Sequence, residues 1–265
     1  MSTMKFAIIA CALAACAAGA IASAQSIYTY PITIDTYIDS GNPTSNFGAY
    51  GYAKVVDSNK PSTSPSECHT LFDLPANLFA CAPGDIVSAS VSFYVWSDST
   101  GNYNVSLAPL TRAFGAGTGA SSKGTSPANG ATWLTSDGTN SWATPGGDYD
   151  SANAIVGVKG PLGPNPADPS GRFITWDITS LLANPTTAAE LQDDGAMLTI
   201  DLGEPLPPAN QQYYASFTSA DSTSYQAPYL PSVELTVVPE PSSLALLVIG
   251  LTGLPLFLMK AKSRS

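Results

Sequence analysis

Four aspartates in the first third of the chain could supply ligands for a metal ion. Asp35, Asp39, Asp57 and Asp73 fall at the ends of short predicted strands and in the adjoining loops. Calcium takes about 6–8 oxygen ligands and accepts both carboxylates and loop carbonyls. A structural Ca²⁺ held by these side chains is one interpretation. The other is that Asp35 and Asp73 cap turns by accepting hydrogen bonds from backbone N–H groups, and the sequence leaves both open. No other cofactor is indicated.

Aromatic side chains could form a second kind of site, one that stacks against sugar rings. Trp133 and Trp142 are the strongest candidates because they flank a polar, glycine-containing loop rather than an alternating strand. The alternative is that these tryptophans belong to the core. For a ligand that carries uronates, the predicted basic contacts are Lys54, Lys60 and Arg112. The remaining aromatic candidates are Trp96, Trp176, Tyr94 and Tyr103.

Catalytic chemistry finds little support in the sequence. The chain has one histidine, His69, which excludes a zinc site built on several histidines. Cys68 precedes it directly, but adjacent residues of a strand point to opposite faces, so a catalytic Cys–His pair is not expected. A glycosidase needs two carboxylates at a defined separation, and no motif singles out such a pair. We expect a protein that is not an enzyme.

Composition places these residues in a turn-rich β protein. Charged residues make up 11% of the 265 positions, against about 25% in an ordinary soluble domain. The chain contains 22 glycines and 22 prolines, too many for a helical bundle. Its net charge of −10 argues against nucleic-acid binding, which needs clustered Lys and Arg. Residues 25–238 alone hold six basic and 19 acidic residues, a formal charge of −13.

Alternating apolar and polar residues predict the strands. The clearest strand is 87–96, followed by 196–202 and 232–237, and each has one apolar face. Such alternation is typical of antiparallel sheets that are buried on one side. Residues 25–238 are therefore expected to form one β-sandwich domain, with a single helical turn at 178–182. Weaker strands are predicted at 32–38, 53–56, 70–72, 103–107, 173–175 and 213–218.

The N-terminus reads as a secretory signal peptide, residues 1–24. Lys5 supplies the positive start, residues 6–21 are apolar, and Ala22, Ser23 and Ala24 fit a small-residue cleavage site. Export to an oxidising compartment bears on the two cysteines that would remain, Cys68 and Cys81. We expect them to form one disulfide, which would stabilise the fold by about 3 kcal/mol.

The C-terminus, residues 239–265, has three distinct parts. Pro239, Glu240 and Pro241 precede an uncharged 18-residue segment, 242–259. As a helix it would measure about 27 Å, close to the roughly 30 Å of a bilayer core. Lys260, Lys262 and Arg264 follow it, the basic flank expected on the cytoplasmic side.

The order of these three parts resembles the PEP-CTERM signal of Gram-negative bacteria. The resemblance implies processing by an exosortase at the inner membrane, association with an exopolysaccharide matrix, and a location in the cell envelope, at the outer surface or in the extracellular matrix. A plain single-span transmembrane anchor is the alternative, and the sequence does not establish whether the helix is cleaved.

Several blocks of the body resemble DNRLRE-type domains. The opening block runs from Asp35-Thr36-Tyr37 to Asn46-Phe47-Gly48, and later blocks lie at 71–75, 86–95, 131–133 with Trp142, 173–182, 217–219 and 228–230. The resemblance implies a non-catalytic, jelly-roll-like antiparallel β-sandwich. Some members bind acidic polysaccharides such as alginate and are classed as carbohydrate-binding modules. The family's closing block usually carries an Arg-Glu pair, whereas Ser219-Ala220-Asp221 has no arginine. Two roles follow as expectations: a structural or adhesive matrix protein, or a module with a defined glycan site.

Overall fold

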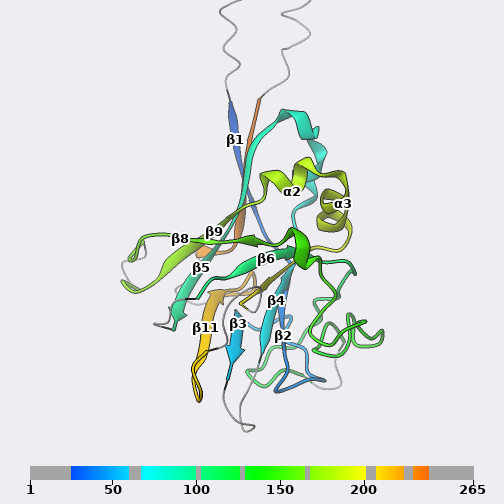
Figure 1. Ribbon diagram of the computed structural model, residues 1–265, viewed down its shortest axis with the longest axis vertical. Coiled ribbons are helices and arrows are strands. Elements are labelled where there is room, and N and C mark those ends of the chain that lie inside the picture. The colour runs from blue at the N-terminus through cyan, green and yellow to red at the C-terminus, as the bar shows by residue number, and fades with distance from the viewer. Residues whose placement is uncertain are drawn as a thin grey trace, which may run out of the picture. The chain divides into compact units, whose positions relative to one another are not determined.

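A computed structural model (Figure 1) describes residues 25–59, 67–99, 103–125, 129–164, 168–200, 207–223 and 229–238. The chain divides into two compact units, residues 27–235 and a second unit made of residues 1–26 with 236–265. Nearly all the described secondary structure belongs to the first. The predicted signal peptide, the Pro-Glu-Pro motif and the apolar segment 242–259 lie outside the described residues. Among those that are described, no helix is long and apolar enough to cross a membrane.

Within the described part of the chain, twelve strands form one connected sheet. The order is β1-β12-β5-β11-β3-β4-β10-β6-β7, with β2 beside β4, β9 beside β5, and β8 beside β9. The pairings among β2 to β11 are antiparallel. The predicted all-β, antiparallel class is therefore confirmed, while the jelly-roll winding stays a prediction. The strands are β1 (Ser26–Pro31), β2 (Asp35–Asp39), β3 (Tyr52–Ser58), β4 (Cys68–Phe72), β5 (Ile86–Asp98), β6 (Ser106–Pro109), β7 (Ile155–Val156), β8 (Val158–Lys159), β9 (Arg172–Asp177), β10 (Ala196–Thr199), β11 (Gln212–Thr218) and β12 (Ser232–Val237).

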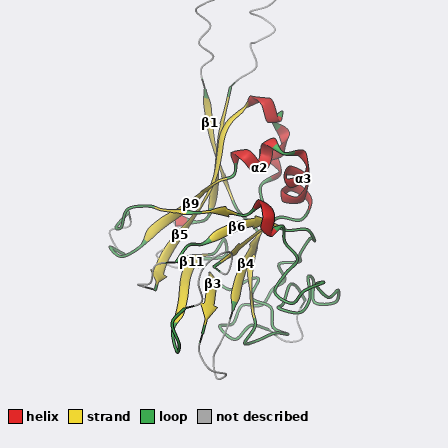
Figure 2. Cartoon of the chain, viewed as in Figure 1, coloured by secondary structure: helices red, strands yellow, loops and turns green. Residues whose placement is uncertain are grey.

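Helical structure is short and gathers at one end of the sheet (Figure 2). The helix α2 (Thr179–Ala183) contacts α3 (Pro185–Asp193), and 3₁₀ turns among the described residues include η1 (Ala76–Ala80), η2 (Pro83–Asp85) and η3 (Ser151–Asn153). The expected turn at 178–182 corresponds to α2. The helix α3 was not predicted, although its start is legible in the sequence. The Asn184 side chain accepts a hydrogen bond from the Thr186 N–H, and Pro185 occupies the first helical position, the usual residues at these two places.

The predicted alternation holds from residue 89 to residue 93 of β5, but Tyr94, predicted on the polar face, is fully buried as well. Ala89, Val91, Phe93 and Val95 are all buried, while Val87 at the strand's start is 42% exposed. The Phe93 ring lies at the centre of the core, with its centroid 5.1 Å from Phe72, 5.6 Å from Phe217 and 6.2 Å from Trp176, all in edge-to-face contact. Such pairs contribute about 0.5–1.5 kcal/mol each beyond the area they bury. Four strands, β4, β5, β9 and β11, are thereby joined through their side chains.

Long loops fill much of the chain between β6 and β9 (Figure 2), and Asn46 anchors one of them. Its buried amide group donates to the carbonyls of Ala116 (2.6 Å) and Ala131 (3.0 Å) and accepts from the N–H groups of Gly48 (3.2 Å) and Gly119 (2.9 Å). A Cβ atom on Gly119 would lie 1.9 Å from the Asn46 carbonyl oxygen. The loop can therefore approach only because that position is glycine.

The expected disulfide between Cys68 and Cys81 is not formed in the structure. Cys68 begins β4, whereas Cys81 follows η1, which lies beyond the Phe72 end of that strand and contacts α3. Four residues of extended strand span about 13 Å, and a disulfide requires Cα atoms within about 7 Å. The strand thus carries the two cysteines apart despite their short separation in sequence.

Substitution of Asn46 should destabilise the whole domain. Asn46→Ala removes the partner of one buried carbonyl, one part-buried carbonyl and two buried N–H groups, so we expect the free energy of unfolding to fall by roughly 3 kcal/mol or more. Chemical denaturation followed by tryptophan fluorescence measures this change. Asn129→Ala is the matched control, because Asn129 is an exposed asparagine whose hydrogen bonds within the described residues go to Thr118 in the same loop. Equal losses in the two variants would contradict the anchoring role of Asn46.

Candidate functional site

A pocket lined with aromatic rings opens beside β3. Its volume is about 230 Å³, and its lining combines aromatic faces, one lysine and two serine hydroxyls. We call it the aromatic pocket. It is lined by Tyr37, Tyr50, Tyr52, Ala53, Lys54, Trp96, Ser122 and Ser216.

The period of β3 places two of these side chains on one face. Tyr52 and Lys54 are half-buried, while Ala53 and Val55 between and beyond them are fully buried on the other face. In the antiparallel ladder with β11, Lys54 lies opposite Ser216. A hydroxyl group is thereby set next to the lysine.

A β-bulge in β5 shapes another wall of the pocket. Ser216 lies opposite Ser97 and Phe217 opposite Val95, so Trp96 has no partner across this ladder. Bulges of this kind redirect side chains and are frequent beside binding sites. The Trp96 ring lies 5.1 Å from the Tyr52 ring, and its buried indole N–H has no acceptor among the described residues. A buried donor without a partner costs about 1–3 kcal/mol, which a water or ligand oxygen would offset.

Tyr37 and its neighbours form the remaining aromatic wall. The Tyr37 ring stacks on Phe47 at 4.1 Å and lies 6.4 Å from the Tyr50 ring, which in turn meets Tyr52 edge-on at 5.5 Å. Burial raises the pKa of the Tyr37 hydroxyl above its ordinary value. The hydroxyl therefore stays protonated at neutral pH and can donate a hydrogen bond.

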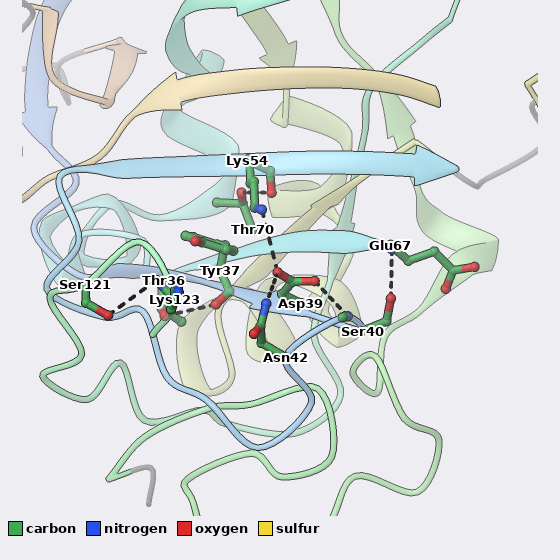
Figure 3. Close-up of polar contacts among 11 residues, drawn as sticks. Thr36, Tyr37, Asp39, Ser40, Asn42, Lys54, Glu67, Thr70, Ser121 and Lys123 are labelled. Carbon is green, nitrogen blue, oxygen red and sulfur yellow. Dashed lines mark hydrogen bonds and ion pairs between the residues drawn. The ribbon is translucent and has the colours of Figure 1, made fainter. Parts of the chain in front are cut away.

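The charge of Lys54 is balanced from within the protein (Figure 3). Its ammonium nitrogen lies 3.6 Å from Asp39 Oδ2 and 4.9 Å from the centre of the Tyr37 ring. Asp39 is buried and accepts hydrogen bonds from the Gly41 N–H (2.8 Å) and from Asn42 Nδ2 (3.0 Å). Lys54 is the one charged side chain in the lining, so the pocket offers flat apolar faces and hydroxyls but no acid–base pair.

The structure places the predicted glycan-binding residues in different surroundings. Trp142 is only 5% exposed, packs in the core with Ile38 and Met197, and donates its indole N–H to the Thr132 carbonyl. It therefore presents no open ring face. Trp133 is half-buried, with its ring 5.1 Å from the His69 ring. Of the basic residues, Lys54 lines the aromatic pocket, Arg112 lies in another groove, and Lys60 is outside the described residues.

That second groove, of about 520 Å³, is polar and open. Arg112 Nε lies 3.0 Å from Asp148 Oδ2, and the same carboxylate accepts hydrogen bonds from the N–H groups of Ala143 and Thr144. The ion pair thus holds loop 143–148 against the residues that follow β6. Its groups are satisfied within the protein, so this groove is a weaker candidate for binding.

The four aspartates predicted to hold calcium do not meet. Asp35 accepts hydrogen bonds from the Ser219 hydroxyl (2.8 Å) and the Ala220 N–H (2.9 Å), as the turn-capping alternative requires. Asp39 lies at the other end of β2, Asp57 is in β3, and Asp73 follows β4. Among the described residues no group of three or more acidic, cysteine or histidine side chains is placed to hold a metal ion. These carboxylates therefore do not form a single calcium site there.

Cys68 and His69 face different neighbours. Burial raises the pKa of the Cys68 thiol, which lies near Lys54 and Asp39. His69 Nδ1 is 2.7 Å from the Gly146 carbonyl, so this nitrogen carries the proton and donates it. The two side chains thus do not form a nucleophile–base pair, which agrees with the expectation for adjacent strand residues.

Sequence reasoning missed the three tyrosines of the aromatic pocket. Tyr50, Tyr52 and Lys54 recur at every second position, the spacing that puts side chains on one face of a strand, and this signal was available. The contributions of Tyr37 and Trp96 depend on tertiary structure. Neither a protein-family model nor a curated protein matches the chain.

The stability of the protein should fall as the pH rises from about 4 to about 7. Burial raises the pKa of Asp35 and of Asp73 to about 6, from an ordinary value of 3.8. Between these values the folded chain binds more protons than the unfolded chain. These two carboxyl groups stabilise the fold fully at pH values below their pKa in the unfolded chain. The stabilisation is lost as the pH rises through their pKa in the folded chain. We expect Tm, measured by circular dichroism, to decrease over this interval.

Two variants separate this contribution from general charge effects. Asp73→Asn should flatten the Tm profile and raise Tm at high pH, because burial alone causes its pKa shift. Asp137→Asn should leave the profile above about pH 5 unchanged, since hydrogen bonds from Asn140 and Thr139 lower the pKa of that carboxyl and its charge does not change there. A wild-type Tm that rises with pH, or an Asp73→Asn profile as steep as wild type, would contradict the argument.

Proposed function

We propose that this protein is a non-catalytic, exported component of the cell envelope or extracellular matrix that holds exopolysaccharide through its aromatic pocket. The observation that carries the proposal is the arrangement of Tyr37, Tyr50, Tyr52 and Trp96 around hydroxyl groups on one side of β3. A sugar ring has an apolar C–H face and a rim of hydroxyls, and it is complementary to such a surface. The role is adhesive: the domain attaches to a polymer and does not transform it.

The size of the pocket suits the side of a polymer rather than a buried small molecule. Its volume of about 230 Å³ is below the roughly 300–1,000 Å³ typical of pockets that enclose drug-sized ligands. One sugar residue would rest in it while the rest of the chain continues across the surface. Binding of this kind is weak per site and gains strength when many copies meet one polymer.

The sequence at the two ends supports the proposed location. Export would follow from the signal peptide at residues 1–24, and sorting from the PEP-CTERM-like tail with its Pro239-Glu240-Pro241 motif. An exosortase would be the processing partner, and the C-terminal helix would hold the chain at the inner membrane before processing. The resemblance to DNRLRE-type domains supports a jelly-roll sandwich with a carbohydrate-binding role.

Removing a ring from the aromatic pocket should weaken glycan binding without unfolding the domain. We expect Trp96→Ala to lower affinity about 10-fold, because a lost stacking contact is worth on the order of 1 kcal/mol or more. Isothermal titration calorimetry of the full-length chain against a panel of neutral and acidic polysaccharides measures this loss, and circular dichroism verifies folding. Trp96→Phe, which retains a ring, should lose less.

Trp133→Ala is the matched control, since Trp133 is a half-buried tryptophan outside the aromatic pocket. Its affinity should equal that of wild type. Binding that depends on Trp133 and not on Trp96 would overturn the assignment of the site. A folded wild-type protein that binds no member of the panel would overturn the proposed function and leave a purely structural role.

A further inference from the structure

We infer that the aromatic pocket selects uncharged sugar residues over uronates, and that Asp39 is the residue that sets this preference by neutralising Lys54. The inference rests on the proposed function and names the class of glycan for the same site. It departs from the expectation of an acidic polysaccharide, for which Lys54 was a predicted contact.

The first argument is the position of the Lys54 ammonium group. The lysine side chain is 31% exposed and its partner, Asp39, only 5%, with 3.6 Å between Nζ and Oδ2. The carboxylate is fixed by its hydrogen bonds from Gly41 and Asn42 (Figure 3), so it cannot turn away from the lysine. A uronate that entered the pocket would contact Lys54, whose ammonium nitrogen already lies 3.6 Å from the Asp39 carboxylate. Its attraction to Lys54 would be largely cancelled by repulsion from Asp39, and little would offset the cost of desolvating its own charge.

The second argument is the state of the other basic side chains that the structure describes. Arg112 is paired with Asp148, Arg172 lies 3.5 Å from Asp98, and the Lys159 ammonium sits 3.6 Å from the centre of the Tyr103 ring. Lys123 is exposed beside the pocket residue Ser122. A polyuronate carries one negative charge on every residue and would need a row of available cations. It would also have to approach a body whose formal charge is −13, which slows and weakens the encounter.

Neutral sugars meet no such obstacle. The Trp96, Tyr52 and Tyr50 rings supply apolar faces, and the Ser216 and Ser122 hydroxyls can donate to or accept from sugar hydroxyls. The Lys54 ammonium, with its charge balanced by Asp39, still has N–H groups that can donate to a neutral hydroxyl. The pair thus keeps a donor in the pocket while removing its net charge.

The test compares oligosaccharides that differ only in the carboxylate. Calorimetry of the full-length chain would use hexasaccharide pairs with one linkage, such as β-1,4-glucan with its polyglucuronate and β-1,4-mannan with its polymannuronate. For the pair that binds, wild type should prefer the neutral member at least about 10-fold, equal to roughly 1.4 kcal/mol. Binding of that member should change little between low and moderate salt, because no ion pair with the ligand forms.

Asp39→Asn should shift this preference toward uronates. The amide oxygen can still accept from the Gly41 N–H, and Asn42 can rotate its own amide to accept from the new NH₂ group. We expect affinity for the uronate member to rise about 5- to 10-fold and to become salt-sensitive, while the neutral member binds within about 3-fold of wild type. Adding Lys54→Gln to Asp39→Asn should abolish the gain. Asp137→Asn, which makes the same change in net charge in a loop outside the pocket, should produce none.

The outcomes separate the two proposals. A wild type that binds the uronate member as tightly as its neutral counterpart, or an Asp39→Asn variant whose preference is unchanged, overturns this inference and leaves glycan binding in place. Failure to bind either member of every pair overturns the proposed function as well. If Asp39→Asn does not fold, Lys54→Gln takes its place: because it leaves the Asp39 charge unbalanced, a stronger preference for the neutral member supports the inference, and an unchanged preference overturns it.

Discussion

The side chain of Asn46 is the contact on which the irregular part of this structure depends. Three of its four hydrogen bonds tie the segment after β2 to the loop that follows β6, and the fourth is local, from the Gly48 N–H. Backbone bonds between Asn46 and Thr125 and from the Ala49 N–H to the Gly119 carbonyl add further links. Loops without secondary structure leave many backbone N–H and C=O groups in need of hydrogen-bond partners. The buried Asn46 amide supplies such partners in two loops at once. Tyr50 and Ser122, both in the aromatic pocket, belong to the segments that Asn46 joins.

One face of β5 packs in the core, and Trp96, near the end of the strand, lines the aromatic pocket. Phe93 packs among Phe72, Phe217 and Trp176, whereas Trp96, three residues later, turns outward at the bulge opposite β11. The rigid core therefore sets the position of a half-buried ring that lines the pocket. A binding surface built on a strand in this way needs no ordering of loose side chains when it meets a ligand.

The protein has few charged side chains. Most of the basic ones within the described residues lie close to an aspartate. Lys54 with Asp39 and Arg112 with Asp148 are held by carboxylates that backbone N–H groups fix in place. Asp35 is buried and accepts two hydrogen bonds. Its pKa is still raised, because burial destabilises the charged carboxylate more than the two hydrogen bonds stabilise it. A surface rich in hydroxyls and amides, with few available cations, is suited to hydrated neutral polymers.

The sequence by itself determined the strands with strong alternation, since a period of two apolar positions forms a buried face wherever the strand lies. It also determined the helical turn at 178–182 and the absence of a multi-histidine metal site. Tertiary structure decided the rest. The two-residue strands β7 and β8 are too short to carry a pattern, Cys68 and Cys81 are separated by the length of β4, and Trp142 is core rather than surface. The aromatic pocket joins residues from 37 to 216, and such contacts depend on strand order and a bulge, which local sequence does not encode.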